Sequence, residues 1–356
     1  VSVRNIESID PTCEYVYDFM MEDNSPHCYL VAGEGWLQTH NSGWVPDSTE
    51  VDSVREMMAA WELDPNFCYD EETECLTDSG WKKYTELTKK DKIASFNPEG
   101  NKLEYYNPDV ITIQNYKGAM YHFDGIGYDM KVTPNHRMWT KRGEEGWGIK
   151  FAEDIKARDQ FRAVIDEYEG NDLPEELEIA GEMVKTADWF EFAGWYLSEG
   201  SIYFNKNYKQ YYTVNISQVK KDGCKTIENL LNRMPWKWNK HGDSYTIGNK
   251  KLATYMRKIF DRGSKNKFVP RWMIDAKKDL LSILLDAWLA GDGTTWKKKD
   301  GDTFKVGYSI SEQLSNDMQE ICFKLGYASH RITRKDCYKQ DEKGNRRYCK
   351  VNGDKY

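Results

Sequence analysis

An internal duplication constrains the second half of this chain more than any other feature of the sequence. Residues 189–198 and 280–290 are apolar around nearly the whole helical circumference, so each predicts a buried helix. The first runs into Glu199-Gly200 and the second into Asp292-Gly293, and the two acidic residues lie 93 positions apart (292 − 199). A constant offset of this kind indicates a repeated unit, so we expect two similar halves.

The segments after the two helices repeat as well. Each acidic-Gly pair is followed by a strand-like stretch that ends in Ile-Ser, and these pairs, Ile216-Ser217 and Ile310-Ser311, lie 94 positions apart (310 − 216). A helix is predicted next, over 226–233 and 315–325. Two buried helices can cross closely only at small side chains, which are present at Ala193, Gly194, Ala287, Ala290 and Gly291.

The acidic residues predict a metal site. A carboxylate at the end of a buried helix is costly unless it meets a cation or water. If the two helices pack side by side, Glu199 and Asp292 come together, and their hard oxygen ligands suit Mg²⁺ held between two phosphate groups.

The duplicated segments FAGWYLSEG and LDAWLAGDG resemble the paired motif of LAGLIDADG homing endonucleases, which are often inserted within inteins. Lys267-Phe268-Val269-Pro270 is also similar to that family. The resemblance covers about 180–350 and implies an α/β nuclease domain with two αββαββα-type halves, which cuts double-stranded DNA with Mg²⁺. By analogy, Gln218 and Lys305 position water or offset charge at the scissile phosphate.

Basic side chains near the motifs predict DNA contacts, because Lys and Arg neutralise phosphates and position the duplex. We expect them to be Lys206, Lys209, Lys220, Lys221, Lys297, Lys298, Lys299, Arg331 and Arg334. The lysine run at 297–299 is, taken alone, equally typical of a solvated turn. An alternative function is open: the domain binds DNA, or serves only as structure, without cleaving.

The first half of the chain is rich in short strand signals. Residues 1–41 and 68–165 both alternate β-forming segments with turns such as Asp78-Ser79-Gly80, so a compact all-β domain is predicted. Residues 42–67 change character and predict a linker with a short helix. The acidic stretch 166–185 predicts a domain junction. We therefore expect 166–356 to form a second domain, which contains the two repeats.

Two groups of residues in the β-rich segments predict breakage of the chain itself. The Asn41 side chain can attack its own carbonyl, with His40 assisting the departing group. The Cys68 thiol can take the acyl group of the preceding residue as a thioester, which is easier to attack than an amide. Thr133 and His136 are placed to polarise that peptide, and Ser42 to receive the acyl group.

Four blocks in these segments resemble inteins of the Hint (hedgehog/intein) fold. They are Cys68 with Leu76-Thr77 and Gly80-Trp81, Thr133-Pro134-Asn135-His136, Tyr17-Asp18-Phe19 with His27 and Leu30-Val31-Ala32, and Thr39-His40-Asn41-Ser42. The resemblance implies protein splicing without a cofactor. It also implies that Asp18 assists transfer to Ser42, and that His27 and His40 assist cyclisation of Asn41.

The order of these blocks departs from the family, because the Asn41 block precedes the Cys68 block. In one interpretation this is a circularly permuted intein that encloses 42–67. In the other, 1–41 ends one intein, 42–67 is host protein (extein), and 68–356 begins a second intein; the missing initiating Met favours this fragment. Autoprocessing without ligation is a third interpretation, against which Ser42 beside Asn41 argues.

Composition limits the partners. The net charge is −8, which argues against coating by nucleic acid but not against a local basic groove. The eight Cys form no CxxC pair, so we expect free thiols in a reducing cytoplasm. No apolar run is long enough for a membrane span. The expected protein is a monomer whose partners are double-stranded DNA, namely the intein-free host gene, and the flanking host-protein segments.

Overall fold

The computed structural model describes most of the chain from Tyr69 onward and a set of strands before it. The described residues are 5–9, 15–21, 28–32, 36–40, 69–97, 101–125, 128–144, 146–162, 164–205, 211–261, 263–297, 303–329, 331, 338–340 and 346–348. The predicted linker 42–67 lies outside them. None of the helices within these ranges is long and apolar enough to cross a membrane.

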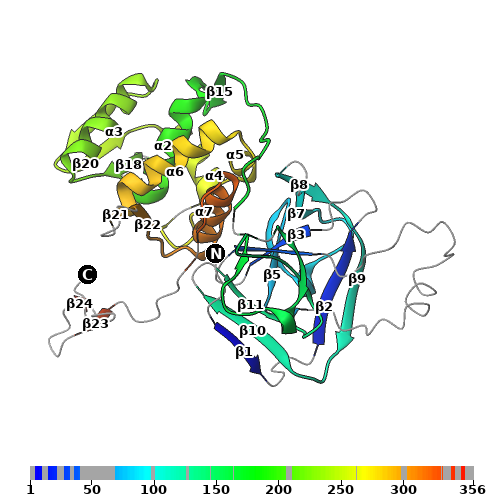
Figure 1. Ribbon diagram of the computed structural model, residues 1–356. Coiled ribbons are helices and arrows are strands. Elements are labelled where there is room, and N and C mark those ends of the chain that lie inside the picture. Colours follow the sequence, from blue (N-terminus) through cyan, green and yellow to red (C-terminus); the bar gives the residue numbers. More distant parts are fainter. Residues whose placement is uncertain are drawn as a thin grey trace.

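The N-terminal part of the chain up to residue 161 is built from strands, as predicted (Figure 1). Four of them precede the linker: β1 (Asn5–Ile9), β2 (Tyr15–Met21), β3 (Cys28–Ala32) and β4 (Trp36–His40). Ten follow it: β5 (Glu74–Thr77), β6 (Gly80–Lys83), β7 (Ile93–Asn97), β8 (Lys102–Tyr106), β9 (Pro108–Asn115), β10 (Met120–Gly125), β11 (Tyr128–Val132), β12 (Arg137–Arg142), β13 (Gly148–Phe151) and β14 (Asp159–Phe161). The short 3₁₀ helices η1 (Tyr84–Glu86) and η2 (Ala152–Asp154) interrupt them.

The four strands before the linker are interleaved with the strands after it. β1 pairs with β10, β2 with β9, and β4 with β12, all antiparallel. β3 lies between β4 and β5 in a nine-stranded sheet whose main order is β13-β12-β4-β3-β5-β7-β8. In Figure 1 the blue strands accordingly lie among the cyan and green ones. Each of β1, β2, β3 and β4 therefore takes backbone partners from strands after the linker, which makes the two segments one β region.

Aromatic packing fills this β region. Phe161 meets Phe123 and Tyr128 edge to face, with ring centroids 5.7 and 5.5 Å apart. All three rings are buried, as alternation along half-buried strands predicts. The resulting core contains residues from β7, β10, β11, β12 and β14.

The second region, from residue 176 onward, is mixed α/β. Its helices are α2 (Thr186–Glu199), α3 (Lys221–Arg233), α4 (Lys250–Phe260), α5 (Arg271–Ile274), α6 (Lys278–Asp292) and α7 (Glu312–Lys324). Its strands are β15 (Glu176–Ile179), β16 (Glu182–Lys185), β17 (Gly200–Asn205), β18 (Tyr211–Ser217), β19 (Trp238–His241), β20 (Ser244–Ile247), β21 (Gly293–Lys297), β22 (Thr303–Gly307), β23 (Tyr338–Gln340) and β24 (Arg346–Tyr348).

Both predicted motif helices are confirmed, and so is the strand pair after each. α2 leads directly into β17–β18 and α6 into β21–β22, and a further helix follows in each repeat. Two details differ from the prediction. Ile216-Ser217 ends β18, but Ile310-Ser311 lies beyond β22, because Ser311 is the N-cap of α7 and Ile310 is exposed. The predicted junction 166–185 also contains a hairpin, β15–β16.

The motif helices α2 and α6 pack closely at their small residues, as predicted. A Cβ atom added to Gly194 would lie 2.5 Å from the carbonyl oxygen of Leu284 and 2.6 Å from the Cβ atom of Ala287. Such distances leave no room for a side chain, so the two backbones approach as closely as glycine permits. Both helices are buried within the largest apolar core, which includes Trp189, Trp195 and Leu284.

The two regions meet along α7 (Figure 1). Phe323 of α7 is fully buried in an apolar cluster with Leu76, Phe96 and Leu103 of the β region. Backbone hydrogen bonds continue the contact, because the amide of Leu103 donates to the carbonyl of Glu167 at 3.0 Å. The last long helix of the α/β region is therefore part of the packing of the β region as well.

Candidate active sites

Glu199 and Asp292 lie at the adjoining C-terminal ends of α2 and α6. A Cβ atom on Gly291 would come within 2.9 Å of the Cγ atom of Glu199, so the two helix ends touch. Burial, together with the nearby Glu199 carboxylate, raises the pKa of Asp292 to about 6. The predicted meeting of the two acidic residues is thus found, and both side chains are half-buried.

A buried lysine occupies the end of α2. Lys267 is 3% exposed, and its ammonium donates to the carbonyls of Tyr196, Leu197 and Gly200 at 2.7, 3.0 and 2.9 Å. Burial lowers the pKa of Lys267 to about 8, while the negative charges of Asp292 and Glu199 oppose that shift. A cation at a helix C-terminus also complements the helix dipole.

A second lysine has the matching position at the end of α6. The Lys220 ammonium donates to the carbonyls of Ala290 and Gly291 at 3.3 and 3.1 Å. Its charge lowers the pKa of Asp292, against the effects of burial and of Glu199. Each motif helix therefore ends at a carboxylate and a lysine, and the lysine is supplied by a different segment of the chain.

Gln218 and Lys305, which were also predicted to be catalytic, each interact with a neighbouring segment in the structure. Gln218 is 3% exposed, and its side-chain oxygen accepts from the amides of Val219 and Lys220, both at 2.9 Å. Lys305 on β22 forms an exposed ion pair with Asp286 of α6, with 3.0 Å between the charged atoms. Their roles at a scissile phosphate stay predictions.

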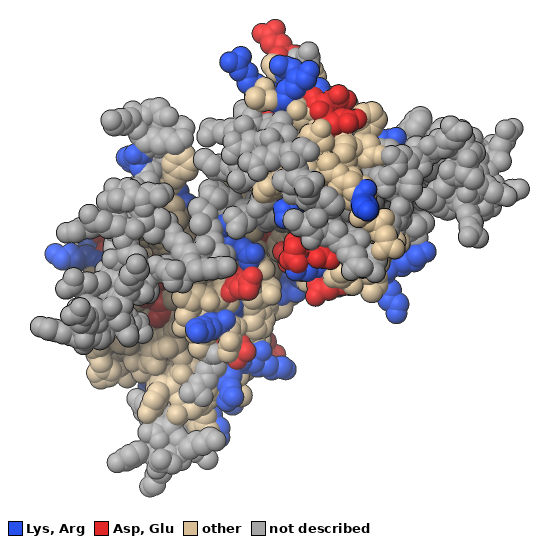
Figure 2. All heavy atoms as spheres, turned by 90° about the horizontal axis from the view of Figure 1, so that it is seen from below, with Lys and Arg blue, Asp and Glu red and all other residues tan. Residues whose placement is uncertain are grey.

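Some of the predicted DNA-contacting residues lie within the part of the chain that the structure describes, and the others lie outside it. Lys221 at the start of α3 and Lys297 at the end of β21 are exposed. Arg331 is held by Asn316 and by Glu312, the latter at 3.5 Å. The others, apart from Lys220, lie outside the described residues: Lys206, Lys209, Lys298, Lys299 and Arg334. On the face in Figure 2, Lys and Arg lie among Asp and Glu side chains.

The donor set at Glu199 and Asp292 fits a divalent cation. The Glu199 carboxylate contributes to the raised pKa of the half-buried Asp292, and a hard cation between the two carboxylates would relieve this repulsion. Within the described part of the chain, no cluster of three or more His, Cys, Asp or Glu side chains is arranged to bind a metal. Glu199 and Asp292 are thus the two residues here that could hold such a cation.

In the β region, the predicted pair Thr133 and His136 lies beside the residue that follows Cys68. Both are fully buried, and the His136 amide donates to the Thr133 carbonyl at 3.0 Å, which closes the turn between β11 and β12. The Nε2 atom of His136 lies 2.9 Å from the hydroxyl of Tyr69. Tyr69 itself bridges to Val132 in the strand before the turn.

The strand that ends at His40 reaches the same turn. β4 pairs with β12 through Thr39 opposite Met138, and with β3 through His40 opposite Cys28. Asp18 lies on β2, opposite Thr112 of β9. The side chains of Asp18 and His40 lie outside the described part, as do Cys68, His27, Asn41 and Ser42 entirely. Backbone register thus brings the His40 strand end and Tyr69 to one segment, 132–138.

This chain is similar to segments of two longer proteins. No family model matches it. An ATP-dependent Clp protease proteolytic subunit of Chlamydomonas moewusii is 29% identical over 287 residues, 74% of this chain and 28% of the relative. A DNA-directed RNA polymerase subunit beta C-terminal section of Stigeoclonium helveticum is 24% identical over 278 residues, 70% of this chain and 25% of the relative. The chain thus spans about a quarter of these relatives.

Among solved structures, a variant of I-DmoI in complex with its target DNA in the presence of manganese is 14% identical, with a TM-score of 0.24, over 38% of this chain and 74% of its own. The homing endonuclease I-WcaI bound to its DNA recognition sequence is 12% identical, with a TM-score of 0.18, over 40% and 88%. TM-scores this low do not establish a common fold.

Two residues of these sites were not assigned a role from the sequence. The sequence places Lys267 in a family-like tetrapeptide without indicating its role. It indicates no role for Tyr69. The sequence signal for Lys267 is a lysine followed by Phe268-Val269-Pro270, close to the second motif helix. For Tyr69 the signal is its place directly after Cys68, on a stretch predicted to be a strand.

Proposed function

We propose that the α/β region is a Mg²⁺-dependent homing endonuclease of LAGLIDADG type, which cuts double-stranded DNA. The observation that carries this proposal is the carboxylate pair Glu199 and Asp292 at the touching ends of two duplicated helices. A lysine at each helix end supports it, because cationic groups beside a metal-binding carboxylate pair stabilise charge that develops on a phosphate.

Glu199 and Asp292 would hold the Mg²⁺ ion, which when bound polarises the phosphate and lowers the pKa of a coordinated water. Hydrogen bonds to main-chain carbonyls hold the side-chain nitrogens of Lys267 and Lys220 at the helix ends, so both would be in fixed positions when a phosphate arrives. The exposed Lys221 and Lys297 are available for backbone phosphates of the duplex.

The test is cleavage of duplex DNA that carries the host gene without the insertion, in Mg²⁺. The purified protein should produce a double-strand break. Glu199→Gln and Asp292→Asn should abolish the break while leaving DNA binding measurable. Asp279→Asn, at an exposed acidic position in the first turn of the same helix α6, is the matched control and should cleave normally. Binding without cleavage by the unaltered protein would support the alternative, a non-cleaving remnant.

We further propose that the β region is an intein splicing domain of the Hint type, in the permuted arrangement. Support comes from the strand pairing, because β1–β4 pair with strands of 93–151 in the same chain. The end of β4 and Tyr69 meet at segment 132–138, which brings the chain flanking Asn41 towards the chain flanking Cys68. The matched relatives carry unrelated names, as expected of an inserted element.

The proposed chemistry encloses 42–67 between two reacting ends. The Cys68 thiol attacks the Phe67 carbonyl, so that a C–N bond breaks and a C–S bond forms. The Ser42 hydroxyl attacks this thioester, which forms an ester and returns the thiol. The Asn41 side-chain nitrogen then attacks the Asn41 carbonyl and releases the Ser42 amine, which takes the acyl group from its own oxygen. His136 and Thr133 would assist the first step.

This arrangement predicts that 42–67 is released as a closed ring. Mass spectrometry should find that peptide lighter than its linear form by one water, about 18 mass units. The fragments 1–41 and 68–356 should stay together in native gel filtration, since β1–β4 pair with strands of the larger fragment. Cys68→Ala and Asn41→Ala should each prevent the ring. A linear 42–67 peptide from the unaltered chain would instead support autoprocessing, and an intact chain the two-intein fragment.

A further inference from the structure

One helix, α7, holds the backbone that follows the Cα atom of Lys267. The Ser311 hydroxyl donates to the carbonyl of Lys267 itself at 2.6 Å. The Asp317 carboxylate accepts from the amide of Val269 at 2.7 Å. Both side chains are almost fully buried, at 1% and 5% exposed. Two hydrogen bonds of this kind, from side chains about 1.7 turns apart on α7, restrict the direction in which the Lys267 side chain leaves the main chain.

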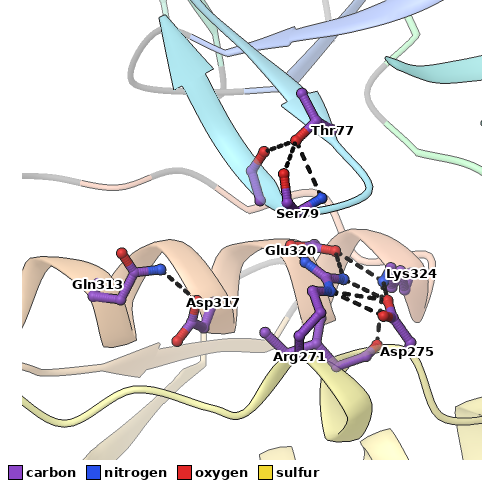
Figure 3. Close-up of polar contacts among 10 residues, drawn as sticks. Thr77, Ser79, Arg271, Asp275, Gln313, Asp317, Glu320 and Lys324 are labelled. Carbon is purple, nitrogen blue, oxygen red and sulfur yellow. Dashed lines mark hydrogen bonds and ion pairs between the residues drawn. The ribbon is translucent and has the colours of Figure 1, made fainter. Parts of the chain in front are cut away.

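Asp317 is a buried carboxylate inside α7 that forms a hydrogen bond with a residue outside this helix. Residue 317 lies in the interior of the helix, where a carboxylate is unfavourable, and burial raises its pKa to about 6. Its second oxygen accepts from Gln313 at 2.8 Å, one turn earlier on the same helix, and Figure 3 shows this contact. The buried carboxylate thus serves a loop amide outside its own helix, in the segment that carries Lys267.

α7 is itself fixed along its axis. Its buried Glu320 and Lys324 join Arg271 and Asp275 in a four-residue ionic network (Figure 3), in which the Lys324 ammonium lies 2.8 Å from Glu320 and 3.0 Å from Asp275. On the other side of α7, the turn between β5 and β6 carries Thr77 and Ser79. The ionic network and the packing of Phe323 against Leu76 hold α7 in place, so Ser311 and Asp317 keep their positions along the helix axis relative to Lys267.

We propose that Ser311 and Asp317 are positioning residues for the Lys267 ammonium. They act through the main chain of 267–269, and they hold the ammonium at the end of α2 beside Glu199 and Asp292. This inference rests on the proposed nuclease function for its effect on cleavage. It does not rest on that function for its structural claim, which is that α7 determines where the Lys267 side chain lies.

The first measurement is single-turnover cleavage of a duplex target under saturating DNA. Ser311→Ala and Asp317→Ala should lower the cleavage rate constant by about tenfold or more, with the dissociation constant for DNA changed less than twofold, because positioning affects the chemical step rather than binding. Ser311→Thr keeps a hydroxyl and Asp317→Asn keeps an acceptor oxygen, so both should restore most of the rate.

The matched control is Asn249→Ala. Asn249 caps α4 as Ser311 caps α7, its side chain accepting from the amide of Leu252 at 2.9 Å, but it does not contact the Lys267 segment. Loss of either cap costs about 1 kcal/mol. Equal losses of cleavage in Asn249→Ala and Ser311→Ala would overturn the proposal, because the effect would then be one of stability alone.

The second measurement does not depend on cleavage. Acetylation of the intact protein by a small water-soluble acylating reagent, followed by peptide mass spectrometry, reports how accessible the Lys267 amine is. We expect slow labelling in the unaltered protein and in Asn249→Ala, and at least severalfold faster labelling in Ser311→Ala and Asp317→Ala. Unchanged labelling overturns the inference. Faster labelling in a protein that never cleaves DNA would support it while contradicting the nuclease function.

Discussion

At the residue scale, the molecule holds two acidic groups whose mutual repulsion the protein relieves only in part. Asp292 is half-buried next to Glu199, and both effects raise its pKa to about 6. The two lysines at the helix ends reduce the repulsion between the carboxylates, but their hydrogen bonds go to main-chain carbonyls. Such unfavourable placement of like charges is typical of functional sites. It lowers the stability of the free protein, and a ligand of opposite charge relieves the repulsion when it binds.

Asp292→Asn should therefore stabilise the protein in the absence of metal. A carboxyl whose pKa is raised by folding binds its proton more tightly in the folded state, so its contribution is present below about pH 4 and lost as pH rises to about 6. At pH 7 the variant should gain about 1 kcal/mol, a value reduced for partial solvent screening of the site. Urea unfolding at pH 7 and pH 4.5 checks this: the gain should shrink at the lower pH, and a constant gain would contradict the repulsion.

A second prediction at this scale concerns His136. His136→Ala should slow thioester formation at Cys68 by about a hundredfold or more, since a positioned imidazole contributes that much to proton transfer. Tyr69→Phe removes the hydroxyl 2.9 Å from His136 and should have a smaller effect. Cleavage by added thiol at 67–68, followed on denaturing gels, measures the step. His241→Ala, at an exposed position on β19, is the control, and a rate loss equal to that of His136→Ala would contradict the assignment.

At the scale of elements, the crossing of α2 and α6 determines whether the acidic pair can form. Gly194→Ala would place a Cβ atom 2.5 Å from the Leu284 carbonyl, which belongs to helix backbone and cannot rotate away. The helices must separate, and we expect a loss of about 1 to 3 kcal/mol in the free energy of unfolding. Gly248→Ala is the matched control, because a Cβ atom there meets nothing within 4 Å. Chemical denaturation of both variants checks the prediction, and equal stabilities would contradict the close crossing.

At the scale of the whole molecule, the buried contact of α7 with the β region couples the two halves. Phe323→Ala removes a fully buried ring from a cluster that includes Leu76 and Phe96, and should cost about 3 kcal/mol. Because α7 also holds the Lys267 segment, the variant should lose cleavage together with stability. Tyr327→Ala, at an exposed position just beyond α7, should lose neither. Separate unfolding transitions in the unaltered protein, unchanged by Phe323→Ala, would contradict this coupling.

The repeated motif helices, a strand-like stretch after each, and the β-rich first region follow from the sequence alone. Each depends on periodicity or on turn residues within a short window, such as the apolar circumference of 189–198 or the turn at 78–80. The pairing of Glu199 with Asp292 was also predictable, because a duplicated helix with small residues packs on its copy. These features are local, or they follow from a symmetry that is visible in one dimension.

Other features were decided by the tertiary structure. β4 pairs with β12 and β2 with β9, although these strands are far apart in the chain. No local sequence pattern indicates which strands pair with each other. The same holds for Lys267 and Lys220, which reach helix ends formed by other parts of the sequence, and for Phe323, whose burial needs the β region. The sequence by itself thus determined the two helices and their carboxylates, and the splicing chemistry of the blocks around Asn41 and Cys68 stays a prediction. Only the tertiary structure decided which backbone amides and carbonyls they meet, because hydrogen bonds and close packing between distant segments depend on the whole fold.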